Sequence, residues 1–165
     1  MAVGGRACAG APARDKVKAL YRKGELMLQG SCLCGLVQYE YNGELGPIAM
    51  CHCSQCRRAQ GSAYATNSPI LASQFRIVTG QELVKEFESS PGKKRAFCRE
   101  CGSPIYSRLD SKPDTLRLRI GSVTTPIEAK PSYHIYANSA AEWYEFTDGL
   151  PRYVRKPLKV ATHST

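Results

Sequence analysis

Seven of the eight cysteines fall into three tight clusters, and this spacing constrains the fold more than any other feature of the chain. Zinc–sulfur bonds of about 2.3 Å in a tetrahedron place neighbouring sulfur atoms ~3.8 Å apart, which suits cysteines spaced by one or two residues. Disulfides require no such spacing. The pattern therefore favours metal binding at the three clusters, which are Gly30-Ser-Cys32-Leu-Cys34-Gly35, Cys51-His-Cys53-Ser-Gln-Cys56 and Cys98-Arg-Glu-Cys101-Gly102.

The first and third clusters together predict one closed site with four cysteine ligands. Residues i and i+2 of an extended segment point to the same face, so the thiolates of Cys32 and Cys34 can reach one ion. Between Cys98 and Cys101 the chain has to turn around the metal, and the glycine that follows permits the backbone conformation of such a turn. We expect a structural zinc ion here, which ties the start of the domain to its middle.

The second cluster supplies only three thiolates, from Cys51, Cys53 and Cys56. Structural zinc sites are usually closed by four protein ligands, whereas reactive sites keep one position for water or substrate. The sequence therefore predicts a second, open zinc site, and two zinc ions per chain. Three alternatives stay open: His52 as the fourth ligand, Cys8 folding back from the N-terminal segment, or an iron–sulfur cluster.

The charge of the chain restricts its partners without selecting one. Lys and Arg outnumber Asp and Glu by 23 to 14, a formal net charge of +9, which suits an anionic small molecule, a phosphate or a nucleic acid. The basic residues are scattered rather than concentrated on one helix, so nucleic acid is not favoured. There is no run of 18 apolar residues and no secretory signal, and we expect a protein of the reducing cytoplasm without a membrane span.

Alternating apolar and polar residues predict a mainly β protein with several small antiparallel sheets tied by the structural zinc. Strands are expected around residues 37–41 and 116–120, with shorter ones between them and near residue 134. Short helices are expected at Ser54–Gln60 and Ala140–Trp143. We divide the 165 residues into a flexible N-terminal extension (1–28) that stays out of the core, a zinc-binding domain (29–155) and a C-terminal tail (156–165).

The cysteine clusters and their flanking residues resemble the glutathione-dependent formaldehyde-activating enzyme family, which includes the centromere protein V type and has the Mss4-like fold. The resemblance runs from about Gly30 to Tyr153. Beyond the three clusters, it rests on Arg57 and Arg58 after Cys56, on Arg95-Ala-Phe before Cys98, and on the C-terminal stretches His134-Ile-Tyr-Ala-Asn-Ser and Asp148-Gly-Leu-Pro151 with Trp143 between them.

The resemblance implies a structural zinc held by Cys32, Cys34, Cys98 and Cys101, and a catalytic zinc held by the second cluster. It also implies a carbon–sulfur lyase that adds glutathione to formaldehyde to give S-hydroxymethylglutathione. A non-catalytic zinc module that binds glutathione or another thiol is an alternative. A chromatin-associated zinc protein is another.

Six further residues are candidates for a role beside the second zinc. Arg57 and Arg58 could offset the charge of the thiolates and bind a glutathione carboxylate by a forked contact, or they could be two solvated arginines on a short helix. His52 could shuttle protons, or it could be an ordinary strand residue. Lys93, Lys94 and Arg95 could extend an anion-binding rim, or they could belong to a solvated basic turn.

The site assignment predicts that two cysteine substitutions have different effects. Cys101→Ser should unfold the domain, because a structural zinc contributes roughly 10 kcal/mol or more to folding. Cys53→Ser should reduce the zinc content from two to one while the fold persists. Elemental analysis and circular dichroism of the two variants measure this difference. Equal denaturation of both variants would contradict the assignment of structural and reactive sites.

Overall fold

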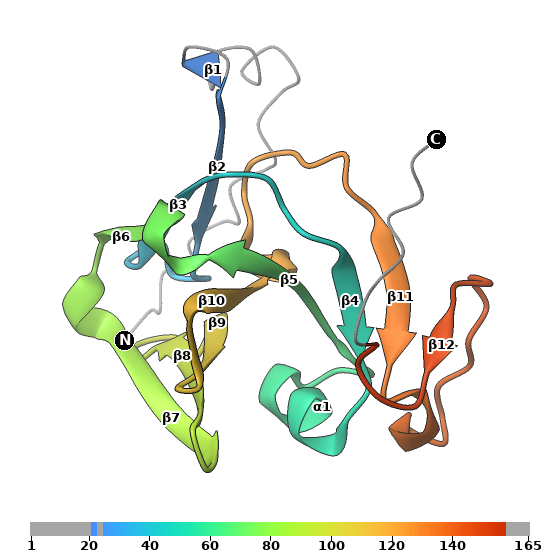
Figure 1. Cartoon of the computed structure of the whole chain (residues 1–165). Coiled ribbons are helices and arrows are strands. Elements are labelled where there is room, and N and C mark those ends of the chain that lie inside the picture. The colour runs from blue at the N-terminus through green and yellow to red at the C-terminus, as the bar shows by residue number, and fades with distance from the viewer. Residues whose placement is uncertain (1–20, 23–24, 158–165) are drawn as a thin grey trace, which may run out of the picture.

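The computed structural model describes residues 21–22 and 25–157, which are mostly β and form a four-stranded and an eight-stranded sheet (Figure 1). The prediction of a mainly β fold is confirmed. The strands are β1 (Tyr21–Arg22), β2 (Glu25–Ser31), β3 (Gln38–Asn42), β4 (Ile48–Cys51), β5 (Ala65–Leu71), β6 (Phe75–Thr79), β7 (Val84–Ser90), β8 (Lys93–Cys98), β9 (Pro104–Leu109), β10 (Lys112–Arg119), β11 (Pro131–Ile135) and β12 (Arg152–Tyr153).

The order of the strands brings distant parts of the sequence together. The smaller sheet has the order β1-β2-β3-β6, and the larger has the order β12-β11-β4-β5-β10-β9-β8-β7. Neighbouring strands run antiparallel except at β11, which is parallel to β4 and to β12. In the larger sheet β4 therefore lies beside β11, some 80 residues later in the chain, and both contribute to the site described below.

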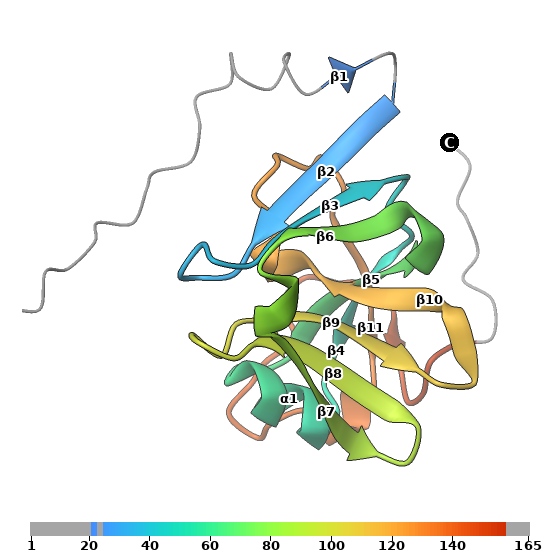
Figure 2. The same ribbon diagram turned by 90° about the vertical axis from the view of Figure 1, so that its left-hand side faces the viewer.

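The main hydrophobic core lies between the two sheets. Figure 2 shows β2, β3 and β6 lying above β10, β9, β8 and β7. Each strand directs alternate side chains into this space, as expected for a sheet with one face on a core. The core includes Leu28, Val37, Tyr39 and Tyr41 on the side of the smaller sheet, and Ile70, Ile105, Leu116 and Leu118 from the larger.

The helices are short, and no helix in the described residues is long and apolar enough to cross a membrane. They are α1 (Ser54–Gln60) and the 3₁₀ turns η2 (Ala72–Gln74), η3 (Gln81–Leu83), η4 (Ile120–Ser122) and η5 (Ala137–Ser139). The helix predicted at Ser54–Gln60 is thus present. The one predicted at Ala140–Trp143 is wrong, because this segment forms a bend and a turn. Four residues are too few to propagate a helix, and Trp143 is 72% exposed and finds no core to stabilise one.

Part of the segment predicted to be a flexible extension belongs to the smaller sheet. Strand β2 begins at Glu25, and the side chain of Leu28 is only 1% exposed. The expectation that residues 1–28 stay out of the core is therefore wrong at Leu28. Cys8 and the C-terminal residues from 158 onward lie outside the described residues, so the rest of the domain division stays a prediction.

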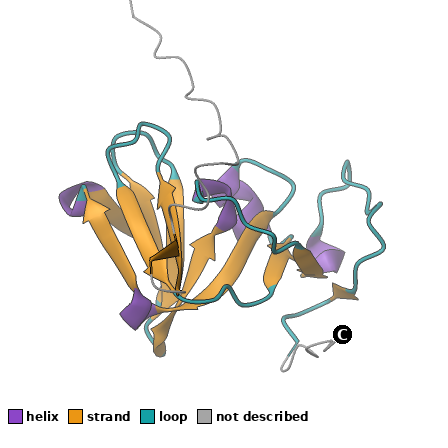
Figure 3. Cartoon of the chain, turned by 90° about the horizontal axis from the view of Figure 1, so that it is seen from above, coloured by secondary structure: helices purple, strands orange, loops and turns teal. Residues whose placement is uncertain are grey.

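The segment between β11 and β12 is largely irregular. Seen from above, the strands of the sheets stand close together, and this segment projects to one side (Figure 3). It contains η5 and supplies Tyr144 and Phe146, whose rings contact the buried ring of His52, and Asp148, which accepts from His134.

Two substitutions on β9 should show that the loss of stability depends on whether the side chain is buried and not on its being in this strand. Ile105 is fully buried between the sheets, whereas Leu109 on the same strand is 38% exposed. Ile105→Ala should lower the free energy of unfolding by about 2–5 kcal/mol, because it leaves a cavity. Leu109→Ala should cost less than about 1 kcal/mol. Denaturant titration in zinc-containing buffer measures both. Equal losses would show that the core is not where the structure places it.

Candidate metal centres and a basic pocket

The first and third cysteine clusters meet where the smaller sheet joins the larger. The Sγ atoms of Cys32, Cys34, Cys98 and Cys101 all lie within 4.8 Å of one another, and those of Cys32 and Cys34 are 3.4 Å apart. Cys34 Sγ is 3.9 Å from Cys98 Sγ, across 64 residues of sequence. These spacings suit a tetrahedral ion with four thiolates, so this group could hold a metal ion such as zinc.

Two glycines allow the chain to turn at this group. Gly35 and Gly102 have φ angles of 76° and 74°, the left-handed region that residues with a Cβ rarely adopt. The amide of Gly102 donates to the carbonyl of Cys98 at 2.8 Å, and the amide of Gly35 donates to the carbonyl of Cys32 at 3.0 Å. Both cysteine pairs therefore lie in tight turns, including the Cys32–Cys34 pair that was expected to be extended.

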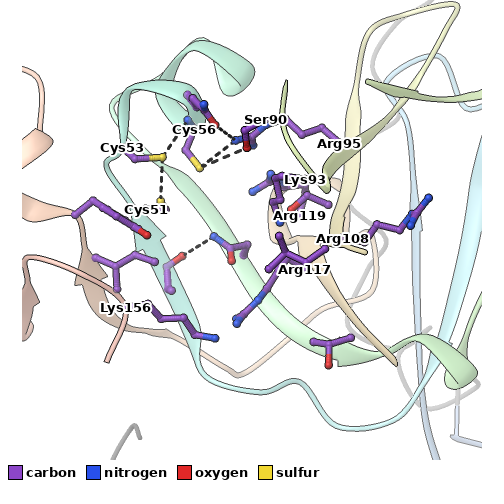
Figure 4. A pocket seen from close by; sticks show the side chains of 18 of the residues that line it. Cys51, Cys53, Cys56, Ser90, Lys93, Arg95, Arg108, Arg117, Arg119 and Lys156 are labelled. Atoms are coloured by element: carbon purple, nitrogen blue, oxygen red, sulfur yellow. Dashed lines mark hydrogen bonds between the residues drawn. The ribbon is translucent and has the colours of Figure 1, made fainter. Parts of the chain in front are cut away.

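The second cluster gathers its three sulfur atoms at the start of helix α1. Cys51 ends β4, Cys53 is the N-cap residue and Cys56 lies in the first turn. Their sulfur atoms lie within 4.8 Å of one another, with 3.6 Å between Cys51 and Cys53 (Figure 4). Within the described residues no fourth Cys, His, Asp or Glu joins this trio. It could hold a metal ion through three ligands.

The trio opens on a pocket of about 600 Å³ over the outer face of the larger sheet. The inward side chains Leu116 and Leu118 of β10 belong to the core, so Arg117 and Arg119 project to the opposite, pocket-lining face. Strand β8 behaves in the same way, with Ala96 and Cys98 buried and Lys93 and Arg95 lining the pocket. Among the residues that the structure describes, the lining includes no Asp or Glu. It includes seven Lys and Arg residues, which are Lys93, Arg95, Arg108, Lys112, Arg117, Arg119 and Lys156.

Two arginines face the thiolates. Nη1 and Nη2 of Arg95 each lie 3.9 Å from Cys56 Sγ. Arg119 is only 3% exposed, and its Nε makes no hydrogen bond with the described residues. Hydrogen bonds from Cys51 and Cys53, followed by the positive charges of Arg119 and Arg95, hold the pKa of Cys56 well below its usual range. The site therefore favours a thiolate even before a metal binds.

His52 lies on the other side of the chain from the trio. Its ring is fully buried, and its Nε2 is 2.8 Å from Nδ1 of His134, whose Nε2 is 3.0 Å from both carboxylate oxygens of Asp148. A carboxylate only accepts, so His134 Nε2–H donates to Asp148, while His134 Nδ1 and His52 Nε2 share one hydrogen bond. Burial lowers the pKa of His52 to about 4, so its ring is neutral at pH 7.

Arg57 also points away from the pocket. Its Nε donates to the backbone carbonyl of His52 at 3.2 Å, and neither Arg57 nor His52 belongs to the pocket lining. The structure thus brings together all seven predicted cysteine ligands in two groups. His52 and Arg57, the two residues predicted to assist the reaction, lie on the side of the trio away from the pocket. Both residues are positioned to hold the backbone that carries Cys51 and Cys53.

The cations that do face the trio were visible in the sequence only as strand residues. Arg117 and Arg119 alternate with Leu116 and Leu118, which predicts a shared face but not what lies on it. Arg95 is the exception, because the sequence predicts its stretch to be either an anion-binding rim or a solvated basic turn, and in the structure Arg95 lines the pocket. No local sequence pattern could have singled out Arg119, because the burial of its side chain depends on strands that are distant in sequence.

These features define a class, a mostly β protein with two cysteine groups suited to a metal and a basic pocket beside one of them. The chain belongs to the glutathione-dependent formaldehyde-activating enzyme family, because the sequence model of that family matches residues 27–139. This confirms the resemblance inferred from the cysteine clusters. The family has the Mss4-like fold.

Two individual proteins are similar over part or most of the chain. An uncharacterised lyase of Schizosaccharomyces pombe is 31% identical over 78 residues, which are 47% of this chain and 55% of that protein. The match thus spans about half the length of that relative. A crystal structure of a Rhodobacter sphaeroides protein has a TM-score of 0.50 and 24% identity, covering 76% of this chain and 98% of the other. It supports the fold alone.

The position of Arg119 leads to a prediction for the thiolate of Cys56. In reduced protein whose trio has been stripped of metal, Arg119→Gln should raise the pKa of Cys56, because a buried cation no longer stabilises the thiolate. The expected rise is about 1–3 pKa units. Alkylation of Cys56 across a pH series, followed by peptide mass spectrometry, measures it. Arg57→Gln is the matched control and should leave the profile in place; an unchanged profile in Arg119→Gln would contradict the charge arrangement.

Proposed function

We propose that the protein is a zinc-dependent carbon–sulfur lyase that forms and cleaves the adduct of glutathione with formaldehyde. The support is membership of the glutathione-dependent formaldehyde-activating enzyme family and similarity to a protein named as a lyase. The observation that carries the proposal is the trio itself. It offers three sulfur ligands, lacks a fourth among the described residues, and opens on a pocket wide enough for a small thiol.

Each cysteine group has a separate task in this proposal. Cys32, Cys34, Cys98 and Cys101 would hold a structural zinc, and Cys51, Cys53 and Cys56 would hold the reactive one. When bound by three cysteines, zinc can take a thiol in its remaining position and deprotonate it at neutral pH. The fit rests on the sulfur spacings within each group, since soft thiolate donors at these distances are the ligands that zinc prefers.

Arg95 and Arg119 offset the negative charge of the three thiolates. Three cysteinates around Zn²⁺ leave a net charge of −1, which would weaken its attraction for a further anion. The guanidinium of Arg95 at Cys56 and the buried guanidinium of Arg119 reduce that penalty. Arg119 also has an unused Nε–H donor, so it can bind a carboxylate of the incoming thiol.

Lys93 is the residue that we propose to move the proton. Attack of a thiolate on formaldehyde creates an oxyanion that must be protonated, and the reverse cleavage needs the same proton removed. Lys93 lines the pocket, and burial together with repulsion from Arg119 and Arg95 lowers its pKa to about 8. A pKa close to working pH lets one amine donate in the forward direction and accept in the reverse.

The proposal predicts a pH-dependent rate of adduct formation from glutathione and formaldehyde. The gain over the uncatalysed addition should fall as the pH rises through about 8, because the Lys93 ammonium then loses its proton. Lys93→Met should lose about 10²-fold of that gain at pH 7. NMR exchange between free formaldehyde and the adduct measures the rate.

A neighbour on the same strand supplies the control. Lys94 pairs with Asp110 at 3.2 Å and does not line the pocket, so Lys94→Met should keep the wild-type rate. Equal losses in both lysine variants would refute the role of Lys93. Glutathione binding by calorimetry without any rate gain in the wild type would instead favour a non-catalytic thiol-binding module.

A further inference from the structure

The basic pocket continues beyond the residues that the proposed reaction uses. Arg95 and Arg119 face the trio, and Lys93 lies beside them. A second group of three cations, Lys112, Arg117 and Lys156, also lines the pocket. Figure 4 shows the nitrogen ends of Arg117 and Lys156 on the side of the pocket away from Cys53 and Cys56. We call these three residues the distal cluster.

The cations of the distal cluster have no carboxylate partner among the described residues; Arg117 is influenced by the nearby Cys51 and Tyr133 side chains only. Arg108, by contrast, forms ion pairs with Glu86 and Asp110, each at 2.7 Å. No carboxylate lies within ion-pair distance of Lys112, Arg117 or Lys156 in residues 25–157. Burial and repulsion from Arg117 and Lys112 lower the pKa of Lys156. Like charges held together without a counter-ion favour the binding of an anion.

Glutathione by itself does not match this charge. Beside its two carboxylates it carries an ammonium group, and the pocket lining contains no Asp or Glu to receive that ammonium. A phosphate carries close to two negative charges at neutral pH and three acceptor oxygens without an accompanying cation. Lys and Arg clusters are the usual protein partners of phosphate. A pocket of about 600 Å³ leaves room for a ligand longer than a tripeptide's thiol arm.

We propose that the pocket takes a small-molecule thiol that carries phosphate, with its sulfur at the trio and its phosphate at the distal cluster. This inference rests on the proposed function of the trio as a thiol site, and it adds phosphate-bearing thiols to glutathione as a second class of ligand. The sheet explains the arrangement. Arg117 and Arg119 are two residues apart on β10 and share one face, so the same strand serves both ends of the pocket.

The test compares two thiols that differ only in one phosphate. Pantetheine and 4′-phosphopantetheine are titrated calorimetrically into the zinc-loaded full-length chain, beside glutathione. Phosphopantetheine should bind at least about tenfold more tightly than pantetheine. The ratio of the two affinities should fall as the salt concentration is raised, because salt screens the charge of the phosphate. Arg117→Gln and Lys156→Gln should each reduce the ratio severalfold, whereas Lys94→Gln should preserve it. Lys112→Gln and Lys156→Gln alter exposed side chains and keep the test valid if Arg117→Gln fails to fold.

The outcomes separate this inference from the proposed function. Equal affinity for the two pantetheines, with glutathione still bound, overturns the phosphate site and leaves the thiol site intact. Failure of every thiol to bind overturns the proposed function itself. Phosphopantetheine that binds equally well after its sulfur is methylated overturns the two-ended arrangement, because the sulfur then does not reach the trio. Displacement of phosphopantetheine by a short DNA duplex at physiological salt would show that the cations serve nucleic acid instead.

Discussion

Side chains alternate between the two faces of a strand, and in the eight-stranded sheet the two faces have opposite environments. One face packs against the four-stranded sheet and carries Ile105, Leu116 and Leu118. The other carries Cys51, Arg95, Arg117 and Arg119 and forms the floor of the pocket. Because the period is two residues, a one-residue shift in strand register would exchange these sets and place arginines in the core. The apolar core therefore fixes the position of every charged group in the site.

The chemistry of the site depends on balanced charge. Three thiolates in one place repel one another, and a metal ion together with the nearby cations offsets that repulsion. Arg119 is buried where a cation would be costly without an anionic neighbour, and Cys56 is that neighbour. The thiolates and the arginine thus stabilise each other's charged forms. In the distal cluster only Arg117 is influenced by a thiol of the trio, Cys51, and no carboxylate among the described residues pairs with Lys112 or Lys156.

Much of the scaffold could be predicted from local sequence. The period-two pattern around residues 37–41 corresponds to β3 and the residue before it, and the pattern around residues 116–120 corresponds to the end of β10. The helix expected at Ser54–Gln60 is α1. The short apolar run at Ala140–Trp143 was misleading, because only Ala141 is buried while Trp143 is exposed, and four residues are too few to propagate a helix. The partner of His52 could not be predicted either. His134 and Asp148 are 82 and 96 residues away, and they meet His52 only because β11 pairs in parallel with β4.

The sequence by itself determined which sulfur atoms act together. Cysteines with one or two residues between them lie at most about 7–11 Å apart along the backbone, so the members of each cluster stay neighbours in any fold. It also determined which residues alternate along each strand. Only the tertiary structure decided that Arg95 from β8 and Arg119 from β10 meet at Cys56, and that His52 and Arg57 turn away from it. Such meetings depend on strand order and register, which arise from the burial of the whole core rather than from any local run of residues.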